Sequence, residues 1–238
     1  MNAKLLIEQA KQWVKDNPTF VYNPDSSSLE GLYEFRHPET QEFIDGYYIK
    51  VVLYKNSLST SFPYVFETKG RIPWELDKHM YSDGRMCLTT KLIQYHACRK
   101  GMDFSTFMEA VVRPFLATHL LLEMGEIDSF PQGEYSHGGK GIIEGYKDHI
   151  GVEDPHRIIE ILNTTRTKQQ RNQPCFCGSG IKHKKCCRSI LRRIRFVRPT
   201  DIEHEVKWIT NYLQETGEEK QSIESTFSDF ASLNPQLK

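Results

Sequence analysis

The sequence lacks a long apolar run and has no net charge. It carries 31 Lys and Arg against 31 Asp and Glu over 238 residues, which excludes a general electrostatic attraction to nucleic acids or membranes. No stretch approaches the roughly 20 apolar residues of a membrane helix. The N-terminal residues Met1–Glu8 show no extended apolar region of a secretory signal. We therefore expect a cytoplasmic protein.

Cysteine is scarce outside one short segment. Four of the six cysteines lie within 13 positions near the C-terminus, at Cys175, Cys177, Cys186 and Cys187. Closely spaced cysteines in a chain without an export signal favour metal binding over disulfides. Four thiolates complete the tetrahedral shell of one zinc ion and leave no position open for substrate. The spacing predicts a structural zinc site.

The run from Pro174 to Cys187, Pro-Cys-Phe-Cys-Gly-Ser-Gly-Ile-Lys-His-Lys-Lys-Cys-Cys, closely resembles the SEC-C motif. That zinc module is best known at the end of the protein-export translocase ATPase and is fused to varied bacterial proteins. A segment this short has almost no core, so the metal should supply most of its folding energy. We expect chelation to unfold the residues after about 170 and to leave the N-terminal domain folded.

The pattern of apolar and turn-forming residues predicts an α+β fold. An amphipathic helix is expected first, followed by an antiparallel β meander and then by helices, the longest of which contains Pro114. The expected helices are 3–16, 104–124, 142–150, 155–162 and 201–213, and the expected strands are 29–35, 43–54 and 63–68.

Changes in composition divide the chain into four parts. The polar stretch before the cysteines reads as a linker, and the chain becomes acidic and serine-rich near its end. The parts are a domain over 1–163, a linker over 164–173, the zinc module over 174–190, and a basic segment, a helix and a loosely ordered acidic tail over 191–238.

A second signal surrounds Cys87. The octet Tyr81–Leu88 reads Tyr-Ser-Asp-Gly-Arg-Met-Cys-Leu, and with the preceding meander it resembles the ubiquitin-conjugating enzymes, which carry Tyr-Ser-(Asp/Asn)-Gly-x-(Ile/Met)-Cys-Leu around their thioester cysteine. The resemblance covers residues 3–125 and implies the fold of those enzymes, with an N-terminal helix, an antiparallel meander and C-terminal helices. It implies that Cys87 holds the C-terminus of a ubiquitin-like or other protein as a thioester and passes it to an amine.

The chain departs from that family just before the octet. The family places His-Pro-Asn there, whereas this chain has Asp77-Lys78-His79. His79 therefore occupies the position of the Asn, where it could donate a hydrogen bond to the reaction's oxyanion. This makes His79 a second candidate catalytic residue. Because the family triplet is missing, the alternative remains that this domain is a catalytically inactive module that binds ubiquitin-like proteins.

The resemblance implies protein partners. The chain has no nucleotide-binding glycine motif, so a separate adenylating enzyme or an already activated donor would supply the acyl group. Bacterial relatives of this kind occur in anti-phage defence operons, where they modify a nucleotide-second-messenger synthase or a structural target. A further alternative is an adaptor in which the basic run 182–198 docks on an acidic protein or on nucleic acid, although the neutral net charge disfavours nucleic acid.

Overall fold

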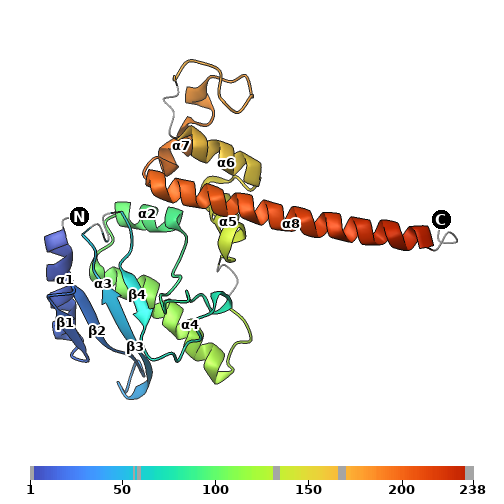
Figure 1. Ribbon diagram of the computed structural model, residues 1–238. Coiled ribbons are helices and arrows are strands. Elements are labelled where there is room, and N and C mark those ends of the chain that lie inside the picture. The colour runs from blue at the N-terminus through green and yellow to red at the C-terminus, as the bar shows by residue number, and fades with distance from the viewer. Residues whose placement is uncertain (1–2, 56, 58–59, 131–134, 166–169, 234–238) are drawn as a thin grey trace. The chain divides into compact units, whose positions relative to one another are not determined.

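The computed structural model divides the chain into two compact units, Met1–Glu134 and Tyr135–Lys238. It describes residues 3–55, 57, 60–130, 135–165 and 170–233, and only the backbone of residues 218–233. The first unit is α+β, with a four-stranded antiparallel sheet and helices, and the second is mainly helical and contains the cysteine cluster (Figure 1). Within these residues, no helix has both the length and the apolar composition that a bilayer crossing requires.

The sheet of the first unit is a meander with the strand order β1-β2-β3-β4. The strands are β1 (Phe20–Asn23), β2 (Ser28–Arg36), β3 (Phe43–Val52) and β4 (Tyr64–Glu67). The last three confirm the expected meander, and β1 is an additional strand. β1 could not be predicted because it has four residues between two turn signals, Asn17-Pro18 and Asn23-Pro24. The segment forms a strand because it pairs antiparallel with β2.

The core of the first unit is apolar and rich in aromatic rings. Helix α1 (Ala3–Asp16) buries Leu6, Ala10 and Trp13. The Trp13 ring meets Phe20 and Phe104 edge-on, with centroids 4.9 and 5.7 Å apart. These contacts join the N-terminal helix to the first strand and to the later helices.

The expected long helix is one continuous run of three segments. They are α3 (Phe104–Phe107), a π-helical turn η2 (Met108–Val112) and α4 (Arg113–Met124). The backbone N–H of Arg113 donates to the carbonyl of Met108, five residues back. Pro114, whose nitrogen cannot donate, follows at the start of α4. The π turn therefore accommodates the proline without splitting the helix. A further helix, α2 (Lys91–Arg99), was not expected.

The second unit is built around a long helix. Its helices are α5 (Gly138–Ile150), α6 (Pro155–Thr164), α7 (Arg188–Ile194) and α8 (Pro199–Leu233), and both α5 and α6 pack on α8. The buried Tyr146 hydroxyl donates to Glu205 at 2.7 Å. A Cβ at Gly139 would lie 2.4 Å from the Trp208 carbonyl oxygen, so this close crossing of α5 over α8 requires glycine.

The division between the compact units lies at residues 134 and 135, and the expected domain end at residue 163 falls within α6. Helices α5 and α6 belong with the cysteine segment because they pack on α8, and α6 also packs on α7. Residues 166–169 of the expected linker and 234–238 of the expected tail lie outside the described residues.

Candidate functional site

Cys87 ends a short hairpin over residues 79–87, which we call the Cys87 hairpin. The N–H of Cys87 donates to the carbonyl of His79 at 2.8 Å, and Met80 and Met86 form an antiparallel bridge. Side chains alternate between the two faces of such a hairpin. Met80 and Met86 are buried in the core, whereas His79, Tyr81 and Cys87 are half-buried on the other face. The hairpin register thus brings His79 opposite Cys87.

The Cys87 hairpin is fixed to the edge of the sheet. Met86 donates its N–H to Val65 at 2.8 Å, and Glu67 donates its N–H to Gly84 at 3.0 Å. Gly84 has φ +79°, and a Cβ there would lie 2.9 Å from the ring of Trp74. The hairpin turn therefore requires glycine, as the octet has it.

His79 is held in an unusual backbone conformation beside the thiol. Its φ of 51° and ψ of 34° are left-handed, which costs a non-glycine residue roughly 1 kcal/mol or more. A ring nitrogen of His79 and the Cys87 sulfur lie within 4.8 Å of each other. The ring also packs edge-on against Phe130, with centroids 4.7 Å apart. Surrounding packing therefore holds the imidazole near the sulfur despite the backbone cost.

Tyr81 contributes a second polar group that sequence reasoning did not assign. Its hydroxyl donates to the Cys87 sulfur at 3.5 Å. Burial, followed by the nearby Cys87, raises the Tyr81 pKa well above its usual range, so the hydroxyl keeps its proton at neutral pH. The guanidinium of Arg85 lies over the Tyr81 ring, 4.4 Å from its centroid. The octet contains Tyr81, but only the hairpin register shows that its hydroxyl reaches the sulfur.

The other cysteine of the first unit has a different environment. Cys98 lies on α2 and is 6% exposed. Burial raises the pKa of its thiol to about 11. Cys98 therefore has the properties of a buried apolar residue.

The four C-terminal cysteines converge. The sulfurs of Cys175, Cys177, Cys186 and Cys187 all lie within 4.8 Å of one another. Two of these separations are 3.4 Å, between Cys177 and Cys186, and 3.6 Å, between Cys186 and Cys187. Sulfurs at the corners of a tetrahedron around zinc, with bonds of about 2.3 Å, lie roughly 3.8 Å apart. The cluster therefore fits one tetrahedral metal ion.

A tight backbone arrangement gathers these sulfurs. The N–H of Cys175 donates to Ile181 and that of His183 to Gln173, at 2.8 and 2.9 Å. The Ser179 hydroxyl, 3.1 Å from the Cys177 sulfur, lowers the pKa of Cys177 to about 6. Burial, followed by the neighbouring cysteines, raises the pKa of Cys187. Four thiolates this close together repel one another, so all four thiols can ionise only around a cation. A bound metal ion provides that cation.

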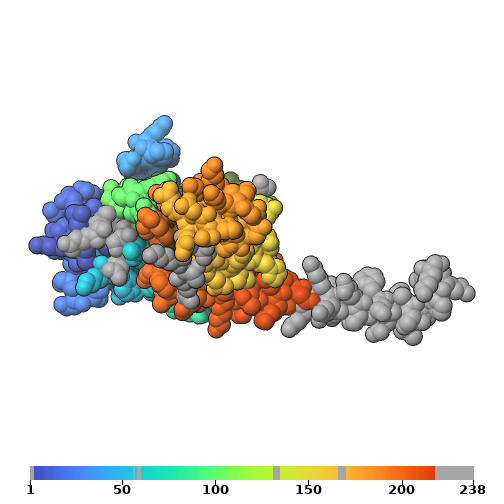
Figure 2. All heavy atoms as spheres, turned by 90° about the horizontal axis from the view of Figure 1, so that it is seen from above, coloured from blue at the N-terminus to red at the C-terminus, as the bar shows by residue number. Residues whose placement is uncertain are grey.

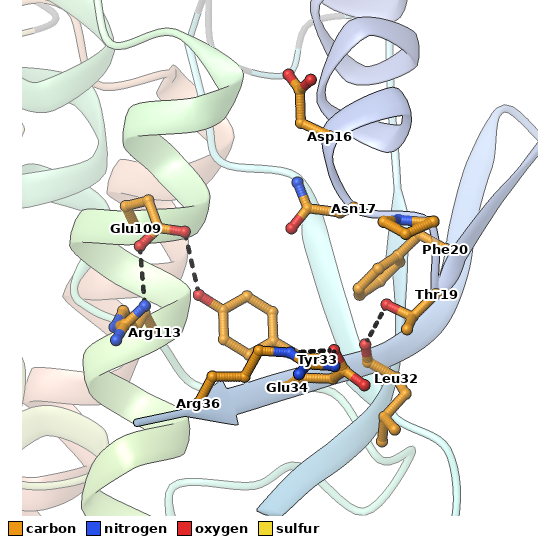
Figure 3. Close-up of a pocket in the computed structure, with 11 residues that line it drawn as sticks. Asp16, Asn17, Thr19, Phe20, Leu32, Tyr33, Glu34, Arg36, Glu109 and Arg113 are labelled. Atoms are coloured by element: carbon orange, nitrogen blue, oxygen red, sulfur yellow. Dashed lines mark hydrogen bonds and ion pairs between the residues drawn. The ribbon is translucent and has the colours of Figure 1, made fainter. Parts of the chain in front are cut away.

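A separate concavity in the first unit lies between the end of α1, the start of β1, the second half of β2 and the π turn. It has a volume of about 360 Å³. Figure 3 shows Tyr33 and Arg113 both directed at Glu109, which they contact at 3.3 and 3.4 Å. Arg36 pairs with Glu34 in the same way. These charged groups pair with one another, so the pocket lacks the convergent polar groups of a ligand site.

Comparison with known proteins identifies one region. Residues 171–189 match the SEC-C motif, which agrees with the resemblance noted from the sequence. No curated protein and no solved structure matches the chain.

Proposed function

We propose that the first unit is a ubiquitin-conjugating-like acyl transferase with Cys87 as its nucleophile. One observation carries the proposal: Cys87 is half-buried on the outer face of its hairpin, with the His79 ring and the Tyr81 hydroxyl beside its sulfur. The order of α1, the meander and the Cys87 hairpin supports this reading. A thiolate needs no additional triad to exchange acyl groups.

The reaction would proceed in two exchanges at the Cys87 sulfur. In the first, the thiolate attacks the carbonyl of a donor thioester, a carbon–sulfur bond to Cys87 forms, and the donor's thiol leaves with its electron pair and takes up a proton. In the second, an amine attacks the same carbonyl, a carbon–nitrogen bond forms, and the Cys87 thiolate is released while the nitrogen loses a proton to solvent. Both steps pass through an oxyanion, for which Tyr81 and His79 are candidate donors.

The partners follow from that chemistry as proposals. The donor would be a ubiquitin-like or other protein activated at its C-terminus by a separate adenylating enzyme. The acceptor would be an amine on a target protein. The proposed setting is a bacterial anti-phage defence system, in which a nucleotide-second-messenger synthase is one candidate target.

A synthetic peptide thioester tests the first exchange without any partner enzyme. We expect a peptide adduct on Cys87 that dithiothreitol removes, that disappears in Cys87→Ala and that persists in the matched control Cys98→Ala. Intact-mass and peptide mass spectrometry would locate the adduct. Equal labelling of Cys98, or no adduct at all, would contradict the transferase.

An inactive binding module is the second candidate, and the Asp77-Lys78-His79 sequence in place of the family triplet favours it. It predicts capture of a ubiquitin-like protein that is unchanged in Cys87→Ala.

An adaptor role is the third candidate. Arg171 and Arg192 lower the pKa of Arg188 by repulsion, so cations gather beside the cysteine segment, where an acidic partner could dock.

The role of His79 has its own test. We expect His79→Ala to slow discharge of the Cys87 adduct to a free amine by about tenfold or more, since it removes an oxyanion donor. Adduct formation should slow much less. Asn also tolerates the left-handed backbone and keeps a donor, so His79→Asn should restore much of the rate. Equal slowing of both steps, measured by single-turnover kinetics, would reduce His79 to a packing residue.

For the second unit we propose a structural zinc ion held by the four cysteines. The match over residues 171–189 and the convergence of the four sulfurs support metal binding. An all-thiolate tetrahedral set favours zinc, and it leaves no open position for substrate. The zinc would hold the cysteine segment folded.

A further inference from the structure

Helix α6 reaches the cysteine cluster through one side chain. The Nη2 of Arg157 donates to the Cys187 sulfur at 3.0 Å. Arg157 lies outside the residues that match the motif, 30 positions before Cys187. No spacing in the sequence points to it. The contact is short enough to be a charge-assisted hydrogen bond to a thiolate.

Two further contacts fix the plane of this guanidinium. Arg157 pairs with Glu160 one turn later on α6. Its Cζ lies 4.9 Å from the ring centroid of Phe176, the residue between Cys175 and Cys177. An Arg donates several N–H groups in a rigid planar fork that stacks flat on aromatic rings, whereas Lys offers a point charge on a flexible stem. Arg157 is therefore oriented toward the sulfur by its own helix and by the cysteine segment together.

The charge of the site gives this contact its importance. Four thiolates around Zn²⁺ carry a net charge of about −2, and Cys187 is only 5% exposed, so water contributes little to neutralising its sulfur. An N–H donated to the sulfur stabilises the bound thiolate. Groups that hydrogen-bond metal ligands in this way typically change metal affinity 10- to 100-fold.

We propose that Arg157 is part of the metal site and couples zinc binding to helix α6. Helix α6 buries Ile158, Ile161 and Leu162 and packs on α7 and α8. Zinc would then stabilise the helical unit and not only the cysteine segment. Figure 2 shows the yellow and orange atoms of α6, the cysteine segment and α7 as one continuous mass. The inference rests on the zinc proposal and is independent of the transferase.

Metal affinity tests the contact directly. Zinc content of the wild-type protein comes first, because a protein without zinc refutes the zinc site itself. In competition with a chromophoric chelator, we expect Arg157→Gln to bind zinc 10- to 100-fold more weakly and Arg157→Lys to fall between. Arg192→Gln, which removes the same charge from an exposed position on α7, should match the wild type. Wild-type affinity in Arg157→Gln, or an equal loss in Arg192→Gln, would overturn the role of Arg157.

Hydrogen exchange tests the coupling. In the wild-type protein, zinc removal should raise amide exchange across α6 at least tenfold. In zinc-loaded Arg157→Gln, α6 should exchange nearly as fast as in the zinc-free wild type. Equal exchange rates in α6 with and without zinc in the wild type would overturn the coupling. This comparison uses the wild type alone, so it tests the coupling even if Arg157→Gln does not fold.

Discussion

At the scale of single residues, the environment of Cys87 depends on one hydroxyl. Tyr81 donates to the sulfur at 3.5 Å, and its raised pKa keeps the donor proton in place. A hydrogen bond to a charged acceptor contributes more than one to a neutral acceptor. The Tyr81 hydroxyl is therefore placed to bond the sulfur most strongly when negative charge develops on it.

Removal of this hydroxyl should be measurable at the thiol itself. We expect Tyr81→Phe to lower the rate of Cys87 alkylation by iodoacetamide at neutral pH about fivefold, the equivalent of roughly 1 kcal/mol. Tyr64→Phe is the matched control, since Tyr64 also stacks on Arg85, at 4.7 Å, and has no described bond to the sulfur. Equal rates in the two variants would show that the Tyr81 hydroxyl does not act on the thiol.

His119 should make the stability of the first unit sensitive to acid. Its side chain is 4% exposed and its Nε2 has no hydrogen-bond partner among the described residues. Burial lowers its pKa from 6.5 to about 4, although the Lys78 backbone and Glu123 oppose the shift. As the pH falls from 6.5 to 4, His119 takes up a proton in the unfolded chain but stays neutral in the folded chain. Stability present above this window is therefore lost within it, by at most about 3 kcal/mol.

Urea unfolding at pH 7 and pH 4.5 measures this effect. His119→Gln cannot take up the proton, so its free energy of unfolding should fall less between the two pH values than that of the wild type, by roughly 2 kcal/mol. The same pH dependence in both proteins would assign the acid sensitivity to other groups.

At the scale of elements, the close crossing of α5 and α8 depends on a glycine. We expect Gly139→Ala to destabilise the second unit by about 1–3 kcal/mol, because the new Cβ would meet the Trp208 backbone. Gly217→Ala is the control on α8, since its Cβ meets nothing within 4 Å and helix propensity predicts a gain of about 0.5–1 kcal/mol. Thermal unfolding of both variants checks the opposite signs, and a neutral Gly139→Ala would contradict the close crossing.

The sequence predicts those elements that carry their own periodic pattern. Helix α1 and strands β2 to β4 follow from apolar spacing, and the cysteine cluster follows from ligand spacing. β1 and α2 do not, because β1 is made by pairing and α2 is short and only partly apolar. The contacts of Tyr81 and Arg157 with cysteine sulfurs are created by hairpin register and helix packing. No local pattern in the chain encodes either contact.

At the scale of the whole molecule, the two units are stabilised by different means. The first has a large apolar core that includes the inward side chains of the sheet, whereas the second combines helix packing on α8 with a cluster of four cysteines. The sequence-based expectation is that chelation unfolds the residues after about 170, and the proposed role of Arg157 extends the expected loosening to α6.

Hydrogen exchange over the full chain can separate the two means of stabilisation. We expect chelation to raise exchange in α6 and the cysteine segment and to leave amides of β2 and β3 unchanged within about twofold, because apolar burial holds the sheet. Exchange of β2 and β3 that rises together with that of the cysteine segment would show that the sheet also depends on the metal.

The bridge between Met80 and Met86 has a consequence for how this chain can vary. Deletion of Arg85 would shift Met86 and Cys87 by one position and so exchange the inward and outward positions of that strand, because they alternate strictly. A thioether would then face solvent and the thiol would be sealed in the interior, with no side chain replaced by another. The exposure of this cysteine therefore depends on an odd or even number of residues in the strand. Insertion or deletion of a single residue there should abolish the reactivity of the thiol, whereas many substitutions would not.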